Sequence, residues 1–560
     1  MFNRSGVIIK NFCIRPFAAL ITLVLVSQIS IPKASYSQSL EDSIEVNIFE
    51  GNLEASWSYY PSTLSFVDGS GNTYDCDVRS FKDCSANQSV SYIQGTVVFP
   101  PCVESNDGPC IEKLELRKSK GEWITANLVR TVRALSRPSD TTIGFPTGGS
   151  MSLWSLPEVP NSTGKGDYAI YVRTSGLSTV NGSLEFGGVT GPYGGGIVAR
   201  VIPYKLESGN FPELKRFTIN SSTGKKSFAH RYEYSESDIN SGALPGPELV
   251  WSDQLGRGIQ ADWVSGSGAR ITLRVPRSVT GWLGGRVGDL EFDLAQIDSK
   301  LNRLVLGGSA LAVDEIQLRI PANGVPLKLR EVYPQSDIRV YMSNGSQHKV
   351  AFRVIDSLRE YTEDRATKQQ FYWGFENADL SKTRCLSESG RLMGVVTTNA
   401  LAYTNSAPTF ESGRLKYAVS GMHYDFKGEI IKGTYDLVLR SDAARCLYGF
   451  SNAPIEASVA VTYGDKEENV STTLSGERNG WLFVSAKNFT FSNPTIEVEL
   501  SQSKRELSSA VSPTPRPTAV SPTAIASSSK KRTITCLKGK VVKKVTATSP
   551  KCPAGFRKRT

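Results

Sequence analysis

The stretch from Gly433 to Tyr463 constrains the fold most, because it contains two long segments in which apolar and polar residues alternate. Residues 433–440 place Tyr435, Leu437 and Leu439 on one face, and residues 455–463 carry an apolar residue at every odd position. Alternation of this length is typical of half-buried β-strands. Between them, residues 441–454 turn the chain and carry Cys446. The stretch predicts a β-sheet that is cross-linked by a disulfide, and such a sheet is typical of a structural scaffold.

The same alternation recurs along most of the chain and predicts an all-β protein. Strand-like segments occur at residues 43–49, 54–59, 89–99, 111–117, 167–173, 194–204, 270–276, 316–320, 415–420, 481–486 and 496–500. Glycine- and proline-rich turn signals separate them. Only residues 354–366 suggest a helix, with Val354, Leu358 and Tyr361 on one face. We expect several antiparallel β-sandwich-like domains in tandem, with little helix.

The composition of successive segments predicts the domain organisation. A chain of 560 residues exceeds what one hydrophobic core normally serves. We expect a signal peptide at 1–37, an N-terminal β domain at 38–135, and a central glycine-rich β region of one or two domains at 136–379. A β-sandwich at 380–500, a disordered Ser/Thr/Pro linker at 501–532 and a small basic disulfide hairpin at 533–560 complete the chain.

The N-terminus has the composition of an export signal. Arg4, Lys10 and Arg15 precede an apolar run over residues 17–31, and small residues follow near Ala34. A membrane anchor is the alternative, but the run is shorter than the roughly 20 residues that a spanning helix needs. We therefore expect a secreted or cell-surface protein with no transmembrane segment in the mature chain.

The cysteines predict disulfides. Of nine cysteines, Cys13 lies in the expected signal peptide. The eight that remain are Cys76, Cys84, Cys102, Cys110, Cys385, Cys446, Cys536 and Cys552. An even number in an oxidising compartment favours disulfides. Cys385 and Cys446 can pair with each other, and the first four allow three pairings, of which we favour the local ones. They could instead bind a metal, although their gaps exceed those of zinc knuckles and no histidine is nearby.

The charge of the chain is concentrated at its ends. The net charge is +10, yet eleven Lys and Arg without an acidic residue lie from Lys530 onward, and four more precede residue 38. The body is therefore mildly acidic, and a general nucleic-acid-binding surface is not implied. The candidate polyanion-binding residues are Lys538, Lys540, Lys543, Lys544, Lys551, Arg557, Lys558 and Arg559. Such a cluster attracts anionic polymers, or else serves as a solvated, solubilising end.

Motifs for catalysis, metals or cofactors do not emerge from the sequence, so we assign no catalytic, cofactor-binding or metal-binding residue. The three histidines, His230, His348 and His423, lack ligand spacing, and no nucleophile elbow or phosphate loop is present. The glycines at 194–196 and 284–285 favour turns or bulges over a ligand cradle. A glycosidase-like carboxylate pair needs a separation that sequence does not supply.

The tryptophans allow two interpretations. Trp282, Trp373 and Trp481 suit the packing of a sheet protein, and they also suit stacking on sugar rings. The packing role is the more common one.

Several stretches resemble large, uncharacterised exported proteins of actinobacteria. They are C-V-E-S-N-D-G-P-C from Cys102, R-V-P-R-S-V-T-G-W-L-G-G-R from Arg274, Y-D-L-V-L-R-S-D-A-A-R-C-L-Y-G-F from Tyr435 and N-G-W-L-F-V-S-A-K-N-F from Asn479. The segment from Cys536 resembles a short basic module that ends many actinobacterial surface proteins. The resemblance implies secretion and an actinobacterial envelope, and it transfers no catalytic residues.

These observations lead to two functional hypotheses. The first is a secreted cell-surface structural or interaction protein, docked through its basic tail to anionic cell-wall polymers or to other surface proteins. The second is a secreted polysaccharide-binding module or glycoside hydrolase. The oligomeric state and the identity of the ligand do not follow from the sequence.

Overall fold

The fold was analysed in a computed structural model of the chain. The structure describes residues 43–50, 62–69, 73–76, 90–103, 108–132, 138–179, 184–186, 196–211, 217–219, 226–228, 249–334, 338–341, 348–378, 383–387, 390–463, 466–469, 472–491, 493–502, 532–538, 541–547, 551–552 and 556–558. The expected signal peptide and most of the expected linker lie outside these residues.

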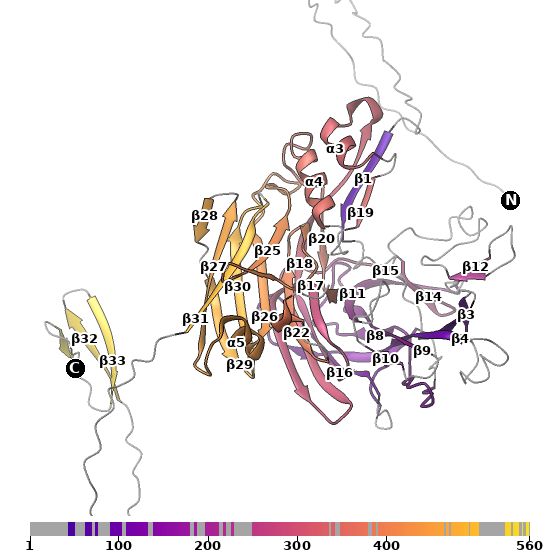
Figure 1. The fold of residues 1–560 in the computed structure, drawn as a ribbon, viewed down its shortest axis with the longest axis horizontal. Helices are drawn as coiled ribbons and strands as arrows, with labels where there is room; N and C mark the ends of the chain where they lie inside the picture. The colour runs from indigo at the N-terminus through magenta and orange to yellow at the C-terminus, as the bar shows by residue number, and fades with distance from the viewer. Residues whose placement is uncertain are drawn as a thin grey trace, which may run out of the picture. The chain divides into compact units, whose positions relative to one another are not determined.

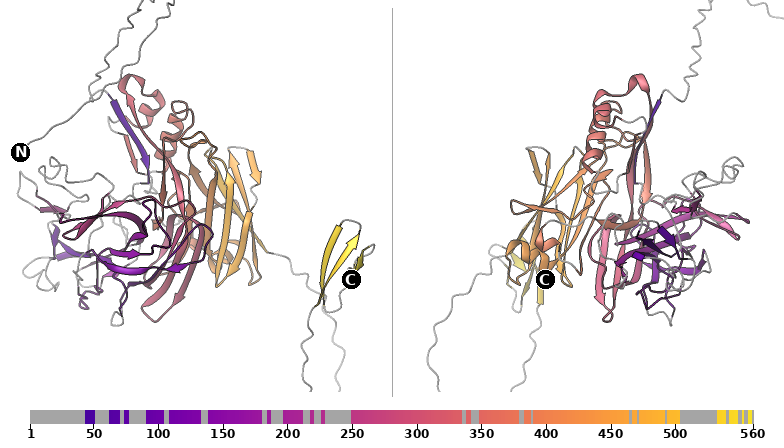
Figure 2. Two further views of the ribbon diagram at one scale, coloured as in Figure 1. Left: turned by 180° about the vertical axis from the view of Figure 1, so that it is seen from behind. Right: turned by 45° about the vertical axis from the view of Figure 1, so that its right-hand side comes forward.

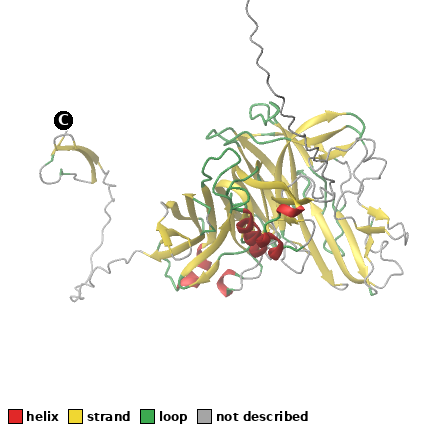
Figure 3. Cartoon of the chain, turned by 90° about the horizontal axis from the view of Figure 1, so that it is seen from above, coloured by secondary structure: helices red, strands yellow, loops and turns green. Residues whose placement is uncertain are grey.

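Strands dominate the described residues, so the prediction of an all-β fold is confirmed (Figures 1 and 3). The chain divides into two compact units, Met1–Ser503 and Lys504–Thr560. Most pairings are antiparallel, as expected from the short turns. Two pairs are parallel, namely β1 (Ser43–Phe49) with β19 (Ile338–Tyr341) and β17 (Gly281–Gln296) with β22 (Leu392–Thr398).

The N-terminal part of the first unit is built around β9 (Asp167–Thr179), which pairs along both edges. Its partners are β4, β8, β10 and β11, and further strands extend from these. The bounds are β2 Thr63–Asp68, β3 Thr73–Asp75, β4 Val90–Val98, β7 Asn127–Thr131, β8 Ser152–Ser155, β10 Glu185–Phe186, β11 Ile197–Ser208, β14 Leu249–Asp253 and β15 Gly256–Gln260. A separate hairpin comprises β12 (Phe217–Ile219) and β13 (Lys226–Phe228).

Two long strands, β17 and β18 (Leu301–Pro321), connect the sheets of the first unit. The second half of β17 pairs with the first half of β18, whereas its first half pairs with β21 (Gly374–Ala378) and β22. The remaining partners of β18 are β1, β16 (Gly268–Pro276) and β20 (Lys368–Tyr372). At the far edge of β16 lie β5 (Cys110–Arg117) and β6 (Ile124–Thr125). In Figures 1 and 2 the two long strands lie between the purple N-terminal strands and the orange C-terminal strands.

A sheet is formed by β22, β26 (Gly433–Arg440), β30 (Trp481–Phe489) and β29 (Thr472–Arg478), and its strands β22, β26 and most of β30 are buried on both faces. On β26, Leu437 and Leu439 belong to the core shared with the C-terminal sheet, whereas Val438 belongs to the N-terminal core. Asp436, on the same face as Val438, is also buried. The expectation of a half-buried strand at residues 433–440 was therefore wrong, because a third layer covers the face that alternation assigned to solvent.

A second sheet covers the other side of this central sheet. Its order is β23-β25-β31-β27-β28, with β24 beside β25. The bounds are β23 Ala402–Tyr403, β24 Thr409–Glu411, β25 Arg414–Ser420, β27 Ile455–Tyr463, β28 Lys466–Asn469 and β31 Thr495–Gln502. Val459, Ile496 and Val498 pack into the core shared with β26 and β30. The two sheets make the sandwich-like part of the fold that the alternation predicted.

Helices are few among the described residues. They are α3 (Leu327–Val332), α4 (His348–Leu358), α5 (Ser441–Tyr448) and the short 3₁₀ turns η2 (Ala322–Gly324) and η4 (Arg384–Leu386). The helix expected at 354–366 begins earlier and ends at Leu358. Residues 441–448, interpreted as a turn, form α5, which ends at Gly449 in the left-handed conformation (φ 64°).

Strands from all three of the expected β-rich segments pair within one network, through β5–β16 and β17–β22. The residues up to Ser503 form one compact unit. The expected domain boundaries near residues 135 and 379 fall inside this unit and remain predictions. In the second unit, β32 (Arg532–Lys538) pairs with β33 (Val541–Ala547) as an antiparallel hairpin, and β34 (Arg557–Lys558) adds a short third strand.

Candidate functional site

Two disulfides join the cysteines that the spacing suggested. Cys102 and Cys110 are bonded across a separation of 8 residues, and Cys385 and Cys446 across 61 residues. The second bridge connects η4 to α5. Cys76 and Cys552 are also disulfide-bonded. Cys84 lies outside the described residues, and Cys536 lies on β32.

The three tryptophans considered for sugar stacking are core residues. Trp282, Trp373 and Trp481 are all buried. The indole nitrogen of Trp282 donates to the carbonyl oxygen of Leu386 at 2.9 Å, and that of Trp373 donates to the carbonyl oxygen of Ala269 at 3.0 Å. Their rings are therefore not available as a sugar-binding platform, and the packing interpretation is confirmed.

The glycines at 284 and 285 occupy a paired strand and not a turn. Both lie on β17, between β21 and β22. A Cβ atom at Gly284 would lie 2.4 Å from Oδ1 of Asn405, and one at Gly285 would lie 2.7 Å from the carbonyl oxygen of Gly374. Close packing explains both glycines, so the turn or bulge interpretation was wrong there. Gly194 and Gly195 lie outside the described residues.

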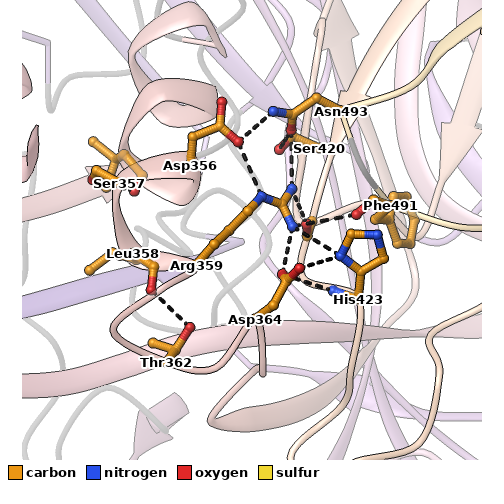
Figure 4. A network of polar contacts seen from close by, with 12 residues as sticks. Asp356, Ser357, Leu358, Arg359, Thr362, Asp364, Ser420, His423, Phe491 and Asn493 are labelled. Carbon is orange, nitrogen blue, oxygen red and sulfur yellow. Dashed lines mark hydrogen bonds and ion pairs between the residues drawn. The ribbon is translucent and has the colours of Figure 1, made fainter. Parts of the chain in front are cut away.

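A polar network joins the C-terminal end of α4 to the loops of the second sheet (Figure 4). Asp364 accepts hydrogen bonds from Nη1 of Arg359 at 2.5 Å and from the backbone nitrogen of His423 at 3.2 Å, and it also contacts Nδ1 of His423. Arg359 donates further to the carbonyl oxygen of Gly421 at 2.8 Å and to Asp356 at 3.1 Å. Its guanidinium thus joins α4, the loop that follows α4 and the end of β25.

This network resembles an acid–histidine pair, but its contacts are those of a structural clamp. Two hydroxyl groups in Figure 4 have other partners: that of Ser420 bonds to Asn493, and that of Thr362 donates to the carbonyl oxygen of Leu358 at 3.0 Å. Neither hydroxyl is paired with His423 as a nucleophile paired with its base would be. The contacts of His423 with Asp364 and Arg359 favour a structural role for this histidine.

A pocket of about 310 Å³ opens at one end of the central sheets. Arginine side chains reach it from three separate segments: Arg277 follows β16, Arg391 precedes β22 and Arg440 ends β26. The other lining residues are Leu294, Gln296, Asn302, Gly390 and Leu392. The β17–β18 hairpin supplies Leu294, Gln296 and Asn302, and Gln296 and Asn302 lie opposite each other in that pairing.

Side-chain contacts hold two of the three guanidinium groups, those of Arg391 and Arg440, in place. Asp442, in the first turn of α5, accepts from Nη1 of Arg391 at 2.9 Å and from Nε of Arg440 at 3.0 Å. The Arg440 guanidinium also lies over the Trp481 ring at 5.4 Å. Partial burial acts to raise the pKa of Asp442, but the hydrogen bond from Arg440 and the two positive charges bring it below its usual value. Asp442 is therefore an ionised bridge between the two arginines.

Sequence reasoning did not find this pocket. Arg277 lies in the quoted motif R-V-P-R-S-V-T-G-W and Arg440 in Y-D-L-V-L-R-S-D, but neither motif contains a ligand-binding spacing. Their proximity depends on the pairing of β17 with β22 and of β22 with β26. Only the fold brings them together.

The candidate polyanion-binding residues fall on or near the C-terminal hairpin. Lys538 lies on β32, Lys543 and Lys544 on β33, and Arg557 and Lys558 on β34. The side chains of Lys551, Arg557 and Lys558 are exposed. Lys540 and Arg559 lie outside the described residues.

The fold and the disulfides define the class of protein as a disulfide-bonded, multi-sheet all-β protein. Within the residues that the structure describes, no group of His, Cys, Asp or Glu side chains is arranged to hold a metal ion. No helix in this part of the chain is long and apolar enough to cross a membrane. Comparisons with protein-family models, with curated proteins and with solved structures returned no match.

Proposed function

We propose that this protein is an exported structural or interaction protein of the cell surface, which docks to anionic envelope polymers through its C-terminal module. The observation that carries the proposal is the charge of that module. Eleven Lys and Arg residues without an acidic residue lie from Lys530 onward, and the module belongs to its own compact unit. Positive charges at this density create a local potential that attracts polyanions.

The disulfides support the extracellular part of the proposal. Bridges such as Cys385–Cys446 persist in oxidising compartments and are rare in the reducing cytosol. The N-terminal sequence has the charge and length of an export signal. A Ser/Thr/Pro-rich segment before the module suits a spacer between a folded body and a surface.

The test compares the whole chain with a chain that ends at Leu507. Both are incubated with purified cell-wall fragments that carry teichoic-type polymers, over a series of salt concentrations. We expect the whole chain to be retained at low salt and released as salt rises, because screening weakens contacts between exposed charges. The shortened chain keeps the described strands of the first unit and should not be retained.

A matched variant tests whether the charge of the C-terminal module, and not merely its presence, causes retention. Substitution of Lys538, Lys543, Lys544 and Lys558 by Gln keeps the chain length and removes four charges. Retention should then fall toward that of the shortened chain. Equal retention of the whole and shortened chains at every salt concentration would reject the proposal.

A further inference from the structure

We propose that the pocket formed by Arg277, Arg391 and Arg440 binds a phosphoryl group, either inorganic phosphate or the phosphate of a monoester. The pocket lies in the first compact unit, so this site is separate from the C-terminal module. The proposal does not depend on the proposed function. Three features support it: the balance of charge, the orientation of the guanidinium groups and the number of directions from which donors converge.

The charge of the pocket suits an anion. Three arginines line it, and the carboxylate of Asp442 is bonded to two of them, Arg391 and Arg440. Arg277 is exposed and forms no ion pair with any carboxylate that the structure describes. Arg277 therefore brings a positive charge that no described carboxylate offsets, and a phosphate monoester carries about −1.5 to −2 at pH 7.

Contacts within the protein fix the arginine donors before a ligand binds. Asp442 fixes Arg391 and Arg440 from one side, and the ring of Trp481 lies against Arg440. A guanidinium held in this way loses less conformational entropy when it binds a ligand, because its fork already has a fixed orientation. The backbone nitrogen of Arg277 donates to the carbonyl oxygen of Lys300 at 2.8 Å, which fixes the segment that carries the third arginine.

The convergence of donors from several segments favours a phosphoryl group over a carboxylate. A carboxylate has two oxygens in one plane, and in Asp442 two arginines already reach both of them, because Oδ1 accepts from Nε of Arg440 and Oδ2 accepts from Arg391 and Arg440. A phosphoryl group presents three or more oxygens in a tetrahedron, which matches three guanidinium groups together with the amides of Gln296 and Asn302. The volume of about 310 Å³ lies at the lower end of the range of about 300–1,000 Å³ that is usual for small-molecule sites.

The test is a titration of the whole chain with three probes: inorganic phosphate, glycerol 1-phosphate and acetate. Binding is followed by calorimetry at low ionic strength for the wild type and for Arg277→Gln, Asn302→Asp and Arg319→Gln. Arg319→Gln is the matched control, since Arg319 is also exposed, lies on β18, and is 4.0 Å from its nearest described carboxylate, Glu45. All variants keep the basic C-terminal module, so any phosphate bound there contributes equally.

We expect saturable binding of at least one phosphate probe to the wild type and to Arg319→Gln. Arg277→Gln should weaken it by about tenfold or more, because one charge-assisted hydrogen bond is lost. Asn302→Asp should weaken it further, because a negative charge enters the pocket. A preference for inorganic phosphate or for glycerol 1-phosphate identifies the free ion or the ester as the occupant. Equal affinity of all four proteins, no saturable binding, or equally tight binding of acetate would overturn the proposal.

Discussion

Arg286 and Glu50 form an ion pair in which neither side chain is exposed to solvent, although 236 residues separate them in the chain. Nε of Arg286 donates to Oε2 of Glu50 at 2.7 Å. The guanidinium also donates to the carbonyl oxygens of Thr398, Ala400 and Leu401. Burial acts to lower the pKa of Arg286, but the charge and hydrogen bond of Glu50, together with smaller contributions from Tyr403 and Tyr372, outweigh it and the pKa is raised. The pair ties β1 to β17 and to the segment after β22.

The first prediction concerns this pair. Glu50→Gln leaves the Arg286 charge in the protein interior without a counter-charge, and breaking a buried pair in this way costs about 3–5 kcal/mol. We expect a loss of about 3 kcal/mol in the free energy of unfolding, since the three backbone carbonyls still accept from Arg286. Denaturant unfolding of the purified protein measures it.

Glu45→Gln provides the control for this experiment. Glu45 lies on β1, which directly precedes Glu50, but its side chain is 39% exposed and its nearest Arg319 nitrogen is 4.0 Å away. An exposed pair of this kind contributes at most about 1 kcal/mol. Equal destabilisation by the two substitutions would show that the buried pair has no special role.

The second prediction is a pH dependence that originates at Asp314. Burial raises the pKa of this carboxyl group from 3.8 to about 6, with a smaller contribution from the charge of Asp425. The folded state therefore holds this proton more tightly than the unfolded state. Between about pH 4 and pH 6 the unfolded chain binds fewer protons, so the free energy of unfolding falls as the pH rises, by about 2–3 kcal/mol in total.

Asp314→Asn isolates this contribution. The amide oxygen can still accept from Nε2 of Gln369, which lies 2.9 Å from Oδ1 of Asp314, but the side chain no longer titrates. The difference in unfolding free energy between the variant and the wild type should therefore shift in favour of the variant from pH 4 to pH 7. Parallel stability curves for the two proteins would contradict the assignment.

The third prediction compares the two disulfides. In the chain-entropy model, closing a loop of 61 residues stabilises the fold by about 4 kcal/mol, and closing one of 8 residues by about 2.5 kcal/mol. The double variant Cys385→Ala/Cys446→Ala should therefore unfold at a lower urea concentration than Cys102→Ala/Cys110→Ala. Removal of both thiols of a pair avoids new pairings. The reverse order of midpoints would mean that native packing, and not loop length, sets the contribution of each bridge.

Local patterns in the sequence predicted the strands well, and long-range relationships less well. Alternation located β27, because the two faces of this strand differ in burial over most of its length, and it located β26 although both faces of that strand are buried. The alternation did not show that a third layer covers Val438 and Asp436, because the sequence of a strand does not tell which elements pack over it. Helix α5 was missed although Ser441 and Asp442 begin it and Gly449 ends it, which are ordinary helix boundary signals.

The candidate sites show the same limit. The sequence suggested the Cys385–Cys446 bridge, because cysteines are few and these two are far from the others in the chain. The partner of Arg286 could not be found in this way: Glu50 is one of 54 acidic residues, and only the fold selects it. Arg286 in the apolar stretch G-W-L-G-G-R-V was a visible signal that a buried charge needs a partner. The arginine pocket had no comparable signal.

The fourth prediction uses two neighbouring residues with the same backbone conformation. Glu363 and Asp364 have φ values of 54° and 55°, in the left-handed region that costs a residue other than glycine about 1 kcal/mol or more. Asp364 is held there by Arg359 and His423, whereas the Glu363 side chain is exposed and forms no ion pair within the described residues.

Substitution by glycine should therefore change the free energy of unfolding in opposite directions at the two positions. Glu363→Gly relieves the backbone cost and should raise the free energy of unfolding by about 0.5 kcal/mol after the added entropy of the unfolded chain is subtracted. Asp364→Gly relieves the same cost but removes the acceptor of Arg359 and His423, and it should lower the free energy of unfolding by about 2 kcal/mol. Glu363→Ala, which keeps the unfavourable conformation, should give no gain. If both glycine variants were stabilised, the network around Asp364 would contribute little to the fold, and its two bonded neighbours would have to be held by other contacts.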